Sequence, residues 1–374
     1  MIIITTQCFA PKIGGVEALM TGMAESMASQ GKDVLVLADG KDNLENDKKT
    51  KYIIKRFHGW KPLRRIRKAA YLEKVCKEQK IDFIYADSWK SIEYLNKKNK
   101  KILVLAHGTE IPKQYWTLII DRLRFKRKRN RIIKSYQGAY RVIANSNYTK
   151  DLMRALLKID HDKIQIIHPG IDVYRDFIST QEEKFVKQIV FDRSPVITTL
   201  ARVEKRKGHK YIINAIYELR LQFPNIIYLI AGRGPYLKNI MDHVKKLNLH
   251  KQVFFLGWIT EPEKSLILKN SDIFAMTPFT SGESVEGFGM AFIDAAFHGV
   301  ASIGSDNGGI SDAIIDGKTG IICESGNQSN ITANLKKLIE DRKLRSELGN
   351  YGKKIAEEKF SWKNKIHEYL NAAI

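Results

Sequence analysis

Cysteine is scarce in this 374-residue sequence, and long apolar runs are missing from it. Cys8, Cys76 and Cys323 are too few and too far apart for a disulfide framework or a zinc knuckle, so we expect small buried side chains. No apolar run is long enough to predict a membrane-spanning helix. The start, MIIITTQCFA, has neither the basic leader nor the cleavage site of a signal peptide and predicts a buried strand. These absences predict a cytoplasmic protein that is soluble or peripheral on the inner face of the cell membrane.

Charge is abundant, and its positive excess is concentrated in one part of the chain. The formal net charge is +22. Residues 51–134 contain 25 Lys and Arg against 7 Asp and Glu, a net of +18, whereas residues 176–374 contain 27 against 23, a net of +4. Because a uniform compositional bias would extend over both halves, this local block predicts a face that meets an anionic partner.

Short apolar, β-branched runs alternate with longer amphipathic segments along the whole chain. This pattern is typical of open, doubly wound parallel sheets, in which each strand is buried on both faces and returns through a helix. The pattern restarts after a polar stretch at 172–195, so we predict an α/β protein with two Rossmann-like domains. The predicted strands lie at 2–5, 34–38, 83–86, 102–106, 141–146 and 165–170, and then at 196–202, 226–234, 253–258, 273–278, 301–305 and 320–323.

Two loops that follow predicted strands carry groups suited to phosphate. Gly14 and Gly15 precede an amphipathic run, so they form either a phosphate-binding helix start or a purely structural turn. Arg202 and Lys207 follow the first strand of the second series, and their planar guanidinium and compact ammonium groups suit a diphosphate. A solvated charged loop is the alternative at this second place, because other charges crowd it: Glu204, Lys205, Arg206 and Lys210.

A third segment, EGFGMAFID at 286–294, places two carboxylates around a glycine-rich turn. A carboxylate accepts two hydrogen bonds and therefore suits neighbouring sugar hydroxyls, which occur on both ribose and a hexose. Gly287 and Gly289 would let the backbone approach a ligand at the start of a helix. The alternative is that Glu286 is a helix-start charge and Asp294 a helix-surface residue.

These segments together resemble the retaining glycosyltransferases of family 4. The mark of that family is a Glu, seven intervening residues and a second Glu, with a GFG-like turn after the first. The resemblance covers nearly the whole chain and is closest to mannosyltransferases that act on phosphatidylinositol mannosides. The other matching motifs are PKIGGVE (11–17), AHGTE (106–110), NSNYT (145–149), HPGID (168–172), ARVEKRKG (201–208), AGRGPY (231–236), FFLGW (254–258) and NGGISD (307–312).

The resemblance implies the GT-B fold, in which two Rossmann-like domains face each other across a deep cleft. Residues 1–175 would form an acceptor-binding domain with a basic membrane-facing surface, residues 176–355 a nucleotide-sugar-binding domain, and residues 356–374 a C-terminal helix packed back on the first domain. The implied reaction is retaining transfer of a hexose from a nucleotide diphosphate sugar, of the GDP-mannose or UDP-glucose type, to a lipid or glycolipid. The resemblance implies no metal or other cofactor.

The resemblance also assigns roles to single positions. The chain departs from the family pattern at Asp294, which replaces a Glu and shortens the reach by about 1.5 Å, and at Asp312, so their roles are left open. The implied catalytic residues are Arg202, Lys207, Glu286 and His107. The implied donor-binding residues are Gly14 and Gly15 under the phosphates, Arg202 and Lys207 on the diphosphate, Trp258 beside the base, Glu286, Gly287, Phe288 and Gly289 on the sugar, and Asp294 on the ribose.

Two segments of the basic block, 60–75 and 116–134, mix cations with apolar and aromatic residues. Each cation near an anionic leaflet contributes on the order of 1 kcal/mol, so these segments predict a membrane-binding face. The alternatives are a soluble family 4 enzyme acting on sugars or polysaccharides and, more remotely, a nucleic-acid-binding protein; we expect no nucleic-acid partner. The residues expected at the membrane are Trp60, Arg64, Arg65, Arg67, Lys68, Trp116, Arg124, Lys126, Arg127, Lys128 and Arg129.

Overall fold

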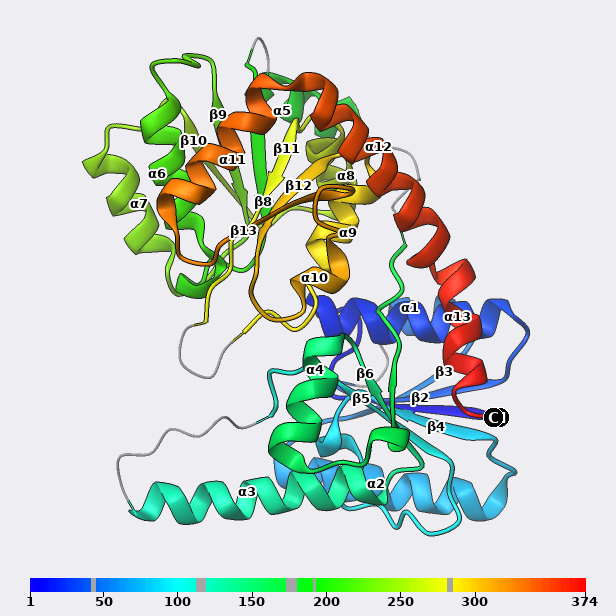
Figure 1. The fold of residues 1–374 in the computed structure, drawn as a ribbon. Helices are drawn as coiled ribbons and strands as arrows, with labels where there is room; N and C mark the ends of the chain where they lie inside the picture. Colours follow the sequence, from blue (N-terminus) through cyan, green and yellow to red (C-terminus); the bar gives the residue numbers. More distant parts are fainter. Residues whose placement is uncertain (42–44, 112–118, 173–179, 191–192, 281–284) are drawn as a thin grey trace. The chain divides into compact units, whose positions relative to one another are not determined.

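The computed structural model, drawn in Figure 1, describes residues 1–41, 45–111, 119–172, 180–190, 193–280 and 285–374. Its internal contacts divide the chain into two units. The first unit consists of Met1–Asp172 together with Phe360–Ile374, and the second consists of Val173–Lys359. Within the described residues, no helix is both long enough and apolar enough to cross a bilayer.

The first unit is built on a parallel sheet with seven strands among the described residues, in the order β3-β2-β1-β4-β5-β6-β7. The order reverses between β1 and β4, and open sheets of this kind bind ligands beyond the carboxyl ends of the strands at such a point. The strands are β1 (Ile2–Thr5), β2 (Val34–Asp39), β3 (Ile53–Phe57), β4 (Phe83–Ala86), β5 (Ile102–Ala106), β6 (Arg141–Ala144) and β7 (Ile164–Ile166). The α-helices are α1 (Gly15–Ser29), α2 (Lys61–Glu78), α3 (Ile119–Gly138), α4 (Asn147–Leu152) and α13 (Trp362–Asn371).

Side chains of β1 alternate between two apolar layers. Ile3 packs in the cluster that contains Leu72 of α2, whereas Ile2 and Ile4 pack in the cluster that contains Leu19 of α1. Successive side chains of a strand point to opposite faces, and helices cover both faces here, so a central strand must be apolar at nearly every position. The edge strand β3 carries exposed residues, and for this reason the sequence pattern did not predict it.

The C-terminal helix α13 belongs to the first unit although it follows the second in sequence. A Cβ on Gly22 of α1 would lie 2.1 Å from the Trp362 indole, and a Cβ on Gly170 would lie 2.5 Å from it, so these two glycines make room for the ring. The Tyr85 hydroxyl donates to the Tyr369 carbonyl oxygen at 2.7 Å. Because α12 continues to Lys359, only Phe360–Ile374 of the predicted segment 356–374 lies in this unit.

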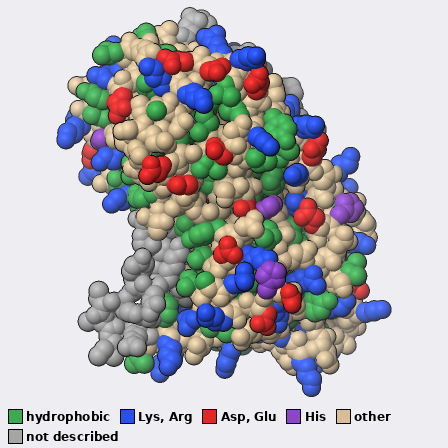
Figure 2. Space-filling view, viewed as in Figure 1, with side chains coloured by type: hydrophobic (Ala, Val, Ile, Leu, Met, Phe, Trp, Pro, Cys, Tyr) green, Lys and Arg blue, Asp and Glu red, His purple; other side chains and the backbone are tan. Residues whose placement is uncertain are grey.

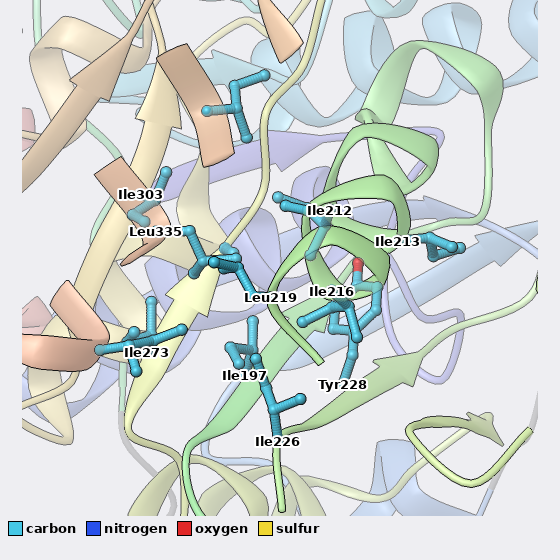
Figure 3. Packing of buried hydrophobic residues seen from close by; sticks show 14 of the residues in the cluster. Ile197, Ile212, Ile213, Ile216, Leu219, Ile226, Tyr228, Ile273, Ile303 and Leu335 are labelled. Carbon is cyan, nitrogen blue, oxygen red and sulfur yellow. The ribbon is translucent and has the colours of Figure 1, made fainter. Parts of the chain in front are cut away.

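The second unit repeats the design with a parallel sheet that has six strands in the described ranges, in the order β10-β9-β8-β11-β12-β13. Figure 3 shows Ile212 and Ile216 of α6 packing near Ile197 of β8 in its largest apolar cluster. The strands are β8 (Val196–Leu200), β9 (Ile227–Ala231), β10 (Val253–Gly257), β11 (Ile273–Ala275), β12 (Ala301–Ser305) and β13 (Gly320–Cys323). The α-helices are α5 (Thr180–Val190), α6 (His209–Leu219), α7 (Leu237–Lys246), α8 (Glu261–Lys269), α9 (Met290–Phe297), α10 (Ile310–Ala313), α11 (Gln328–Glu340) and α12 (Arg342–Lys359).

The strand orders of the two units are equivalent. In each unit the first strand of the chain lies inside the sheet, the next two strands are added on one side of it, and the later strands are added on the other side. The prediction of two doubly wound, Rossmann-like domains is therefore confirmed. In the second unit the order reverses between β8 and β11, so the loops after these two strands are where a ligand site is expected.

Candidate functional site

The loop after β8 and the loop before α9 form one cluster of ion pairs in the second unit. Lys207 Nζ lies 2.6 Å from Glu286 Oε2, and Arg206 Nη1 lies 2.9 Å from the same oxygen. Glu204 binds Arg206 through Oε2 at 2.9 Å and Arg202 through Oε1 at 3.1 Å. Three cations and two carboxylates therefore alternate beyond the carboxyl ends of β8 and β11, and the positive charge is in excess.

The Glu286 carboxyl is held in its ionised form. Burial alone would raise its pKa, but the charges and hydrogen bonds of Lys207 and Arg206 outweigh burial and leave the pKa below its ordinary value. Both cations bind Oε2, so Oε1 has no partner within the part of the chain that the structure describes. An ionised carboxylate oxygen of this kind can accept a hydrogen bond from a ligand hydroxyl.

Glycines set the backbone under this cluster. Gly208 has φ +79°, and a Cβ there would lie 2.0 Å from the Thr277 carbonyl oxygen, so the loop after β8 can pass the loop after β11 only as glycine. Gly308 has φ +66°, and its Cβ would lie 2.0 Å from the Glu286 carbonyl oxygen. The Gly309 N–H donates to that same oxygen at 2.9 Å. The NGGISD motif therefore supports Glu286 through the backbone, a role that the sequence analysis did not assign.

The GFG turn at 287–289 lies inside the unit. The Phe288 side chain is 2% exposed, so it packs within the protein and any contact with a ligand comes from the backbone of the turn. Gly289 has φ +99° and is the N-cap of α9. A helix leaves N–H groups without an intrahelical partner in its first turn, which in α9 begins at Met290.

Asp294 belongs to a separate group of charges. Its Oδ1 accepts a hydrogen bond from Lys264 Nζ at 3.0 Å, and Lys264 also binds Glu261 at 2.6 Å. Burial raises the pKa of Asp294 against the opposing charge of Lys264. Among the described residues, no hydrogen bond or ion pair joins Asp294 to Glu286. Lys264, which comes from α8, is a partner of the expected ribose carboxylate that the sequence pattern did not reveal.

Trp258 directly follows β10 and is 56% exposed, so much of its side chain is accessible to a ligand. Arg202 is the most exposed member of the ion-pair cluster, with 69% of its side chain accessible. Its guanidinium can therefore bind a ligand without leaving Glu204. Within the described ranges, no group of three or more His, Cys, Asp or Glu side chains is arranged to hold a metal ion.

In the first unit, His107 lies at the carboxyl end of β5. Its Nε2 lies 2.8 Å from the Asp87 carbonyl oxygen, and since a carbonyl only accepts, Nε2 donates and Nδ1 of the neutral ring is an acceptor. The His107 backbone N–H donates to Glu110 Oε1 at 2.8 Å, and the Tyr136 hydroxyl donates to the same oxygen at 2.9 Å. The Asp87 carboxylate accepts the Gln7 N–H at 2.7 Å. Residues that follow β1, β4 and β5 thus meet where the strand order reverses.

The two glycines of the PKIGGVE motif lie at the start of α1. Gly15 is the first residue of the helix and Gly14 is its N-cap, with an extended backbone (φ 167°) that does not require glycine. A Cβ on Gly14 would meet the end of the Glu17 side chain, which can rotate away. Glu17 in the first turn means that a phosphate bound at this helix start would lie beside a carboxylate.

The cations of α2 are largely used inside the first unit. Lys68 is 2% exposed and its Nζ binds Asp39 at 2.9 Å, so the prediction that Lys68 meets a membrane is wrong. Arg64 binds the same Asp39 at 2.8 Å, Arg65 binds Glu93, and Arg67 donates to the His58 carbonyl. Three apolar residues at the start of the helix face outward: Trp60 at the N-cap is 70%, Leu63 54% and Ile66 46% exposed, whereas Leu72 and Val75 further along are buried. The sequence pattern placed these charges at the surface because helical spacing alone does not show which side of α2 faces the sheet.

The cations of α3 have a different distribution. Arg124, Lys126, Arg127 and Lys128 are exposed and have no partner within the described ranges, and Leu123 beside them is 56% exposed. Arg129 is half-buried and donates to the Leu156 carbonyl at 3.1 Å. Trp116 lies outside the described residues. Figure 2 shows Lys and Arg side chains along the edge of the first unit where α2 and α3 lie.

Two family descriptions match the chain, one in each half. The family described as "Glycosyltransferase Family 4" matches residues 13–175, and the family described as "Glycosyl transferases group 1" matches residues 180–355. The two matches are contiguous apart from a few residues at 176–179, and together they leave only short ends unmatched.

Curated relatives and solved structures point the same way. A GDP-mannose-dependent alpha-(1-6)-phosphatidylinositol monomannoside mannosyltransferase of Mycolicibacterium smegmatis is 29% identical, and the match spans about half of each protein, 54% of this chain and 54% of the relative. A GDP-mannose-dependent monoacylated alpha-(1-6)-phosphatidylinositol monomannoside mannosyltransferase of Corynebacterium glutamicum is 25% identical over 96% of this chain and 94% of its own. The crystal structure of Anabaena Alr3699/HepE in complex with UDP is 18% identical with a TM-score of 0.79 over 99% of both chains, a likeness that shows the GT-B fold.

Proposed function

Because the chain belongs to the family 4 glycosyltransferases, we propose that it moves a hexose from a nucleotide diphosphate sugar to a lipid or glycolipid acceptor with retention of anomeric configuration. The main support is the cluster in which Lys207 and Arg206 meet Glu286. It combines cations suited to a diphosphate with a carboxylate suited to sugar hydroxyls.

In the proposed reaction Arg202 and Lys207 neutralise the charge that develops on the departing nucleotide diphosphate, which is where electrostatic stabilisation is largest. Glu286 accepts a hydrogen bond from a hydroxyl of the transferred hexose through Oε1. The bond from the anomeric carbon to the phosphate oxygen breaks, and the acceptor oxygen bonds to that carbon on the same face. The acceptor proton passes to the departing diphosphate. We propose that these cations supply the required charge without a metal ion.

GDP-mannose is the donor that the relatives favour. Both mannosyltransferases described above are named for GDP-mannose, and they match by sequence, whereas the UDP-bound neighbour matches by fold. In the proposal Trp258 lies beside the base, Asp294 binds the ribose with Lys264, and the 287–289 backbone holds the hexose.

The acceptor class rests on the relatives' names and on the surface of the first unit. Both relatives are named for phosphatidylinositol mannosides, which are membrane glycolipids. Exposed cations on α3 and outward-facing apolar residues on α2 suit an anionic leaflet, so we place the enzyme on the inner face of the cell membrane. The paired cations of α2 favour the second candidate, an enzyme that acts on a soluble sugar or polysaccharide.

Incubation with membrane lipid extract and a panel of nucleotide sugars tests the donor and the acceptor together. We expect product only with GDP-mannose, a mass increase of one hexose on a lipid, and the same rate in EDTA. Product on an oligosaccharide but not on lipid would select the soluble enzyme, and a rate abolished by EDTA would contradict metal independence. The absence of transfer from any sugar nucleotide would contradict the proposed function.

We expect Gly308→Ala to lower activity about 10²-fold, because its Cβ must displace the Glu286 backbone and a misplacement of about 1 Å costs of that order. Gly317→Ala is a matched control: its φ is +67°, and a Cβ there has nothing within 4 Å. Both variants carry the strain of a left-handed alanine, about 1 kcal/mol. Gly308→Ala adds the clash with the Glu286 backbone, so its melting temperature should fall further than that of Gly317→Ala. Steady-state rates that are equal in the two variants would contradict the assigned role of Gly308.

A further inference from the structure

Arg206 is the most tightly held cation of the cluster, although the sequence offered it only as one charge among several in a crowded loop. Its side chain is 17% exposed. Nε donates to Glu204 Oε2 at 2.9 Å, and Nη1 donates to Glu286 Oε2 at 2.9 Å. The Arg206 carbonyl oxygen accepts the Phe279 N–H at 2.9 Å, so both its backbone and its guanidinium are fixed.

Lys207 binds Glu286 in a different way. Its Nζ is a point charge with three donors on a flexible stem, and one of these donors lies 2.6 Å from Glu286 Oε2. In the proposed reaction this ammonium must also bind the diphosphate, which weakens or replaces its bond to Glu286. A buried carboxylate that loses its only cation would take up a proton or turn away from the sugar. Arg206 prevents this outcome because it binds the same oxygen independently.

We propose that Arg206 is a positioning residue that acts through Glu286: it holds the carboxylate ionised, with Oε1 directed to the sugar, while Lys207 exchanges Glu286 for the diphosphate. In this proposal Arg206 binds Glu204 and Glu286, through Nε and Nη1, rather than the phosphate. Glu204 extends the arrangement to Arg202, which it binds through its other oxygen. This inference rests on the proposed function, because that function supplies the diphosphate and the sugar. The geometry comes from the contacts that Arg206 makes with Glu204 and Glu286.

Removing Arg206 should change the titration of Glu286 as well as the rate. Activity requires the ionised carboxylate, so a higher Glu286 pKa moves the acid limb of the kcat/KM profile to higher pH. An opposite charge at this distance lowers a carboxyl pKa by about one unit or more, and its loss should move the limb by about that amount. Charged or titratable groups face Glu286 or flank the loops that contact it: Arg202, Glu204, Lys205, Arg206, Lys207, Asp306 and Asp312.

The experiment compares Arg206→Met, Arg206→Lys and the control Arg342→Met, an exposed arginine at the start of α12. Binding of GDP alone and of GDP-mannose is measured by calorimetry, and kcat and KM are measured from pH 5 to 9. For Arg206→Met we expect GDP affinity within about threefold of wild type, kcat lower by about 10- to 100-fold, and the shifted acid limb. Arg206→Lys should restore the limb, and Arg342→Met should match wild type.

Two outcomes would overturn the proposal. Equal losses of GDP and GDP-mannose affinity in Arg206→Met would make Arg206 a phosphate ligand. An unchanged acid limb with an unchanged kcat would remove its link to Glu286.

A second measurement needs no ligand and separates this proposal from the proposed function. Arg206→Met, Glu286→Gln and the double variant are compared by thermal unfolding. We expect the double variant to be less destabilised than the sum of the single variants, because residues in contact are energetically coupled. Additive shifts would overturn the inference even if the enzyme is active, whereas a wild-type protein that binds no nucleoside diphosphate would overturn the proposed function and leave the coupling result standing.

Discussion

Lys207→Ala is expected to lower turnover by about 10²- to 10³-fold, the effect of removing one group that stabilises charge in a transition state. Lys207 Nζ lies 2.6 Å from Glu286 in a cluster that the proposed diphosphate must enter. The variant keeps Arg206 on the same carboxylate oxygen, so Glu286 stays paired and the fold should survive. The loss should fall mainly on kcat, because the charge on the diphosphate is greatest as the bond to the sugar breaks.

Lys205→Ala provides the comparison for this prediction. Lys205 lies in the same short turn, with the same side chain, but it is exposed and has no partner among the described residues. Its removal should leave the rate within about twofold, since isolated surface charges contribute little. Rates and melting temperatures of both variants are measured with saturating donor. A rate near the wild-type value in a well-folded Lys207→Ala protein would contradict the assignment of the diphosphate site.

A variant with Arg124, Lys126, Arg127 and Lys128 all replaced by Gln is expected to lose about 10³-fold in partitioning onto anionic vesicles. Each cation near an anionic surface contributes about 1 kcal/mol to binding. Four cations therefore contribute about 4 kcal/mol, which corresponds to a change of about 10³-fold in the partition coefficient. These four side chains are exposed and unpaired among the described residues, unlike the paired cations of α2. Co-sedimentation with vesicles of anionic or neutral phospholipid measures this partitioning. Binding of the wild-type protein to anionic vesicles should weaken as the salt concentration rises.

The control for net charge replaces four exposed lysines of the second unit, Lys238, Lys245, Lys246 and Lys251, by Gln. It changes the formal charge by the same amount and should retain most of the binding. Equal sedimentation of the wild-type protein with anionic and neutral vesicles would contradict the membrane proposal.

A gel-shift assay with RNA and DNA at two salt concentrations tests nucleic acid as the alternative anionic partner. A shift that is lost in the α3 variant, in a protein that does not bind vesicles, would select nucleic acid.

The sequence was informative wherever local chemistry repeats. Apolar β-branched runs predicted the central strands, because a strand covered on both faces has to be apolar at nearly every position. The edge strand β3 was missed because its partly exposed side chains break that pattern. Arg202, Lys207 and Glu286 were selected by residue type and by motif, and the structure brings Lys207 and Glu286 into direct contact and links Arg202 through Glu204.

The partners of the selected residues could not be predicted in the same way. Arg206 and Glu204 lie in a loop where five of the six residues at 202–207 are charged. Nothing in the order of these residues distinguishes a charge that bridges two loops from one in solvent. Lys264 meets Asp294 from another helix, 30 positions away in sequence. Asp87 contacts His107 because β4 and β5 end side by side in the sheet, whereas Glu110 lies only three residues further along the same loop.

The sequence by itself determined the class of the protein, which has two doubly wound sheets and belongs to the family 4 glycosyltransferases, and it offered residue types suited to the proposed chemistry. These depend on periodicity and on short motifs, which are local properties of the chain. Only the tertiary structure decided which charges are free to act. It places Lys68 inside the first unit, holds Arg206 between two carboxylates and leaves Arg124, Lys126, Arg127 and Lys128 of α3 exposed. Burial and pairing depend on which elements pack together rather than on neighbours in sequence.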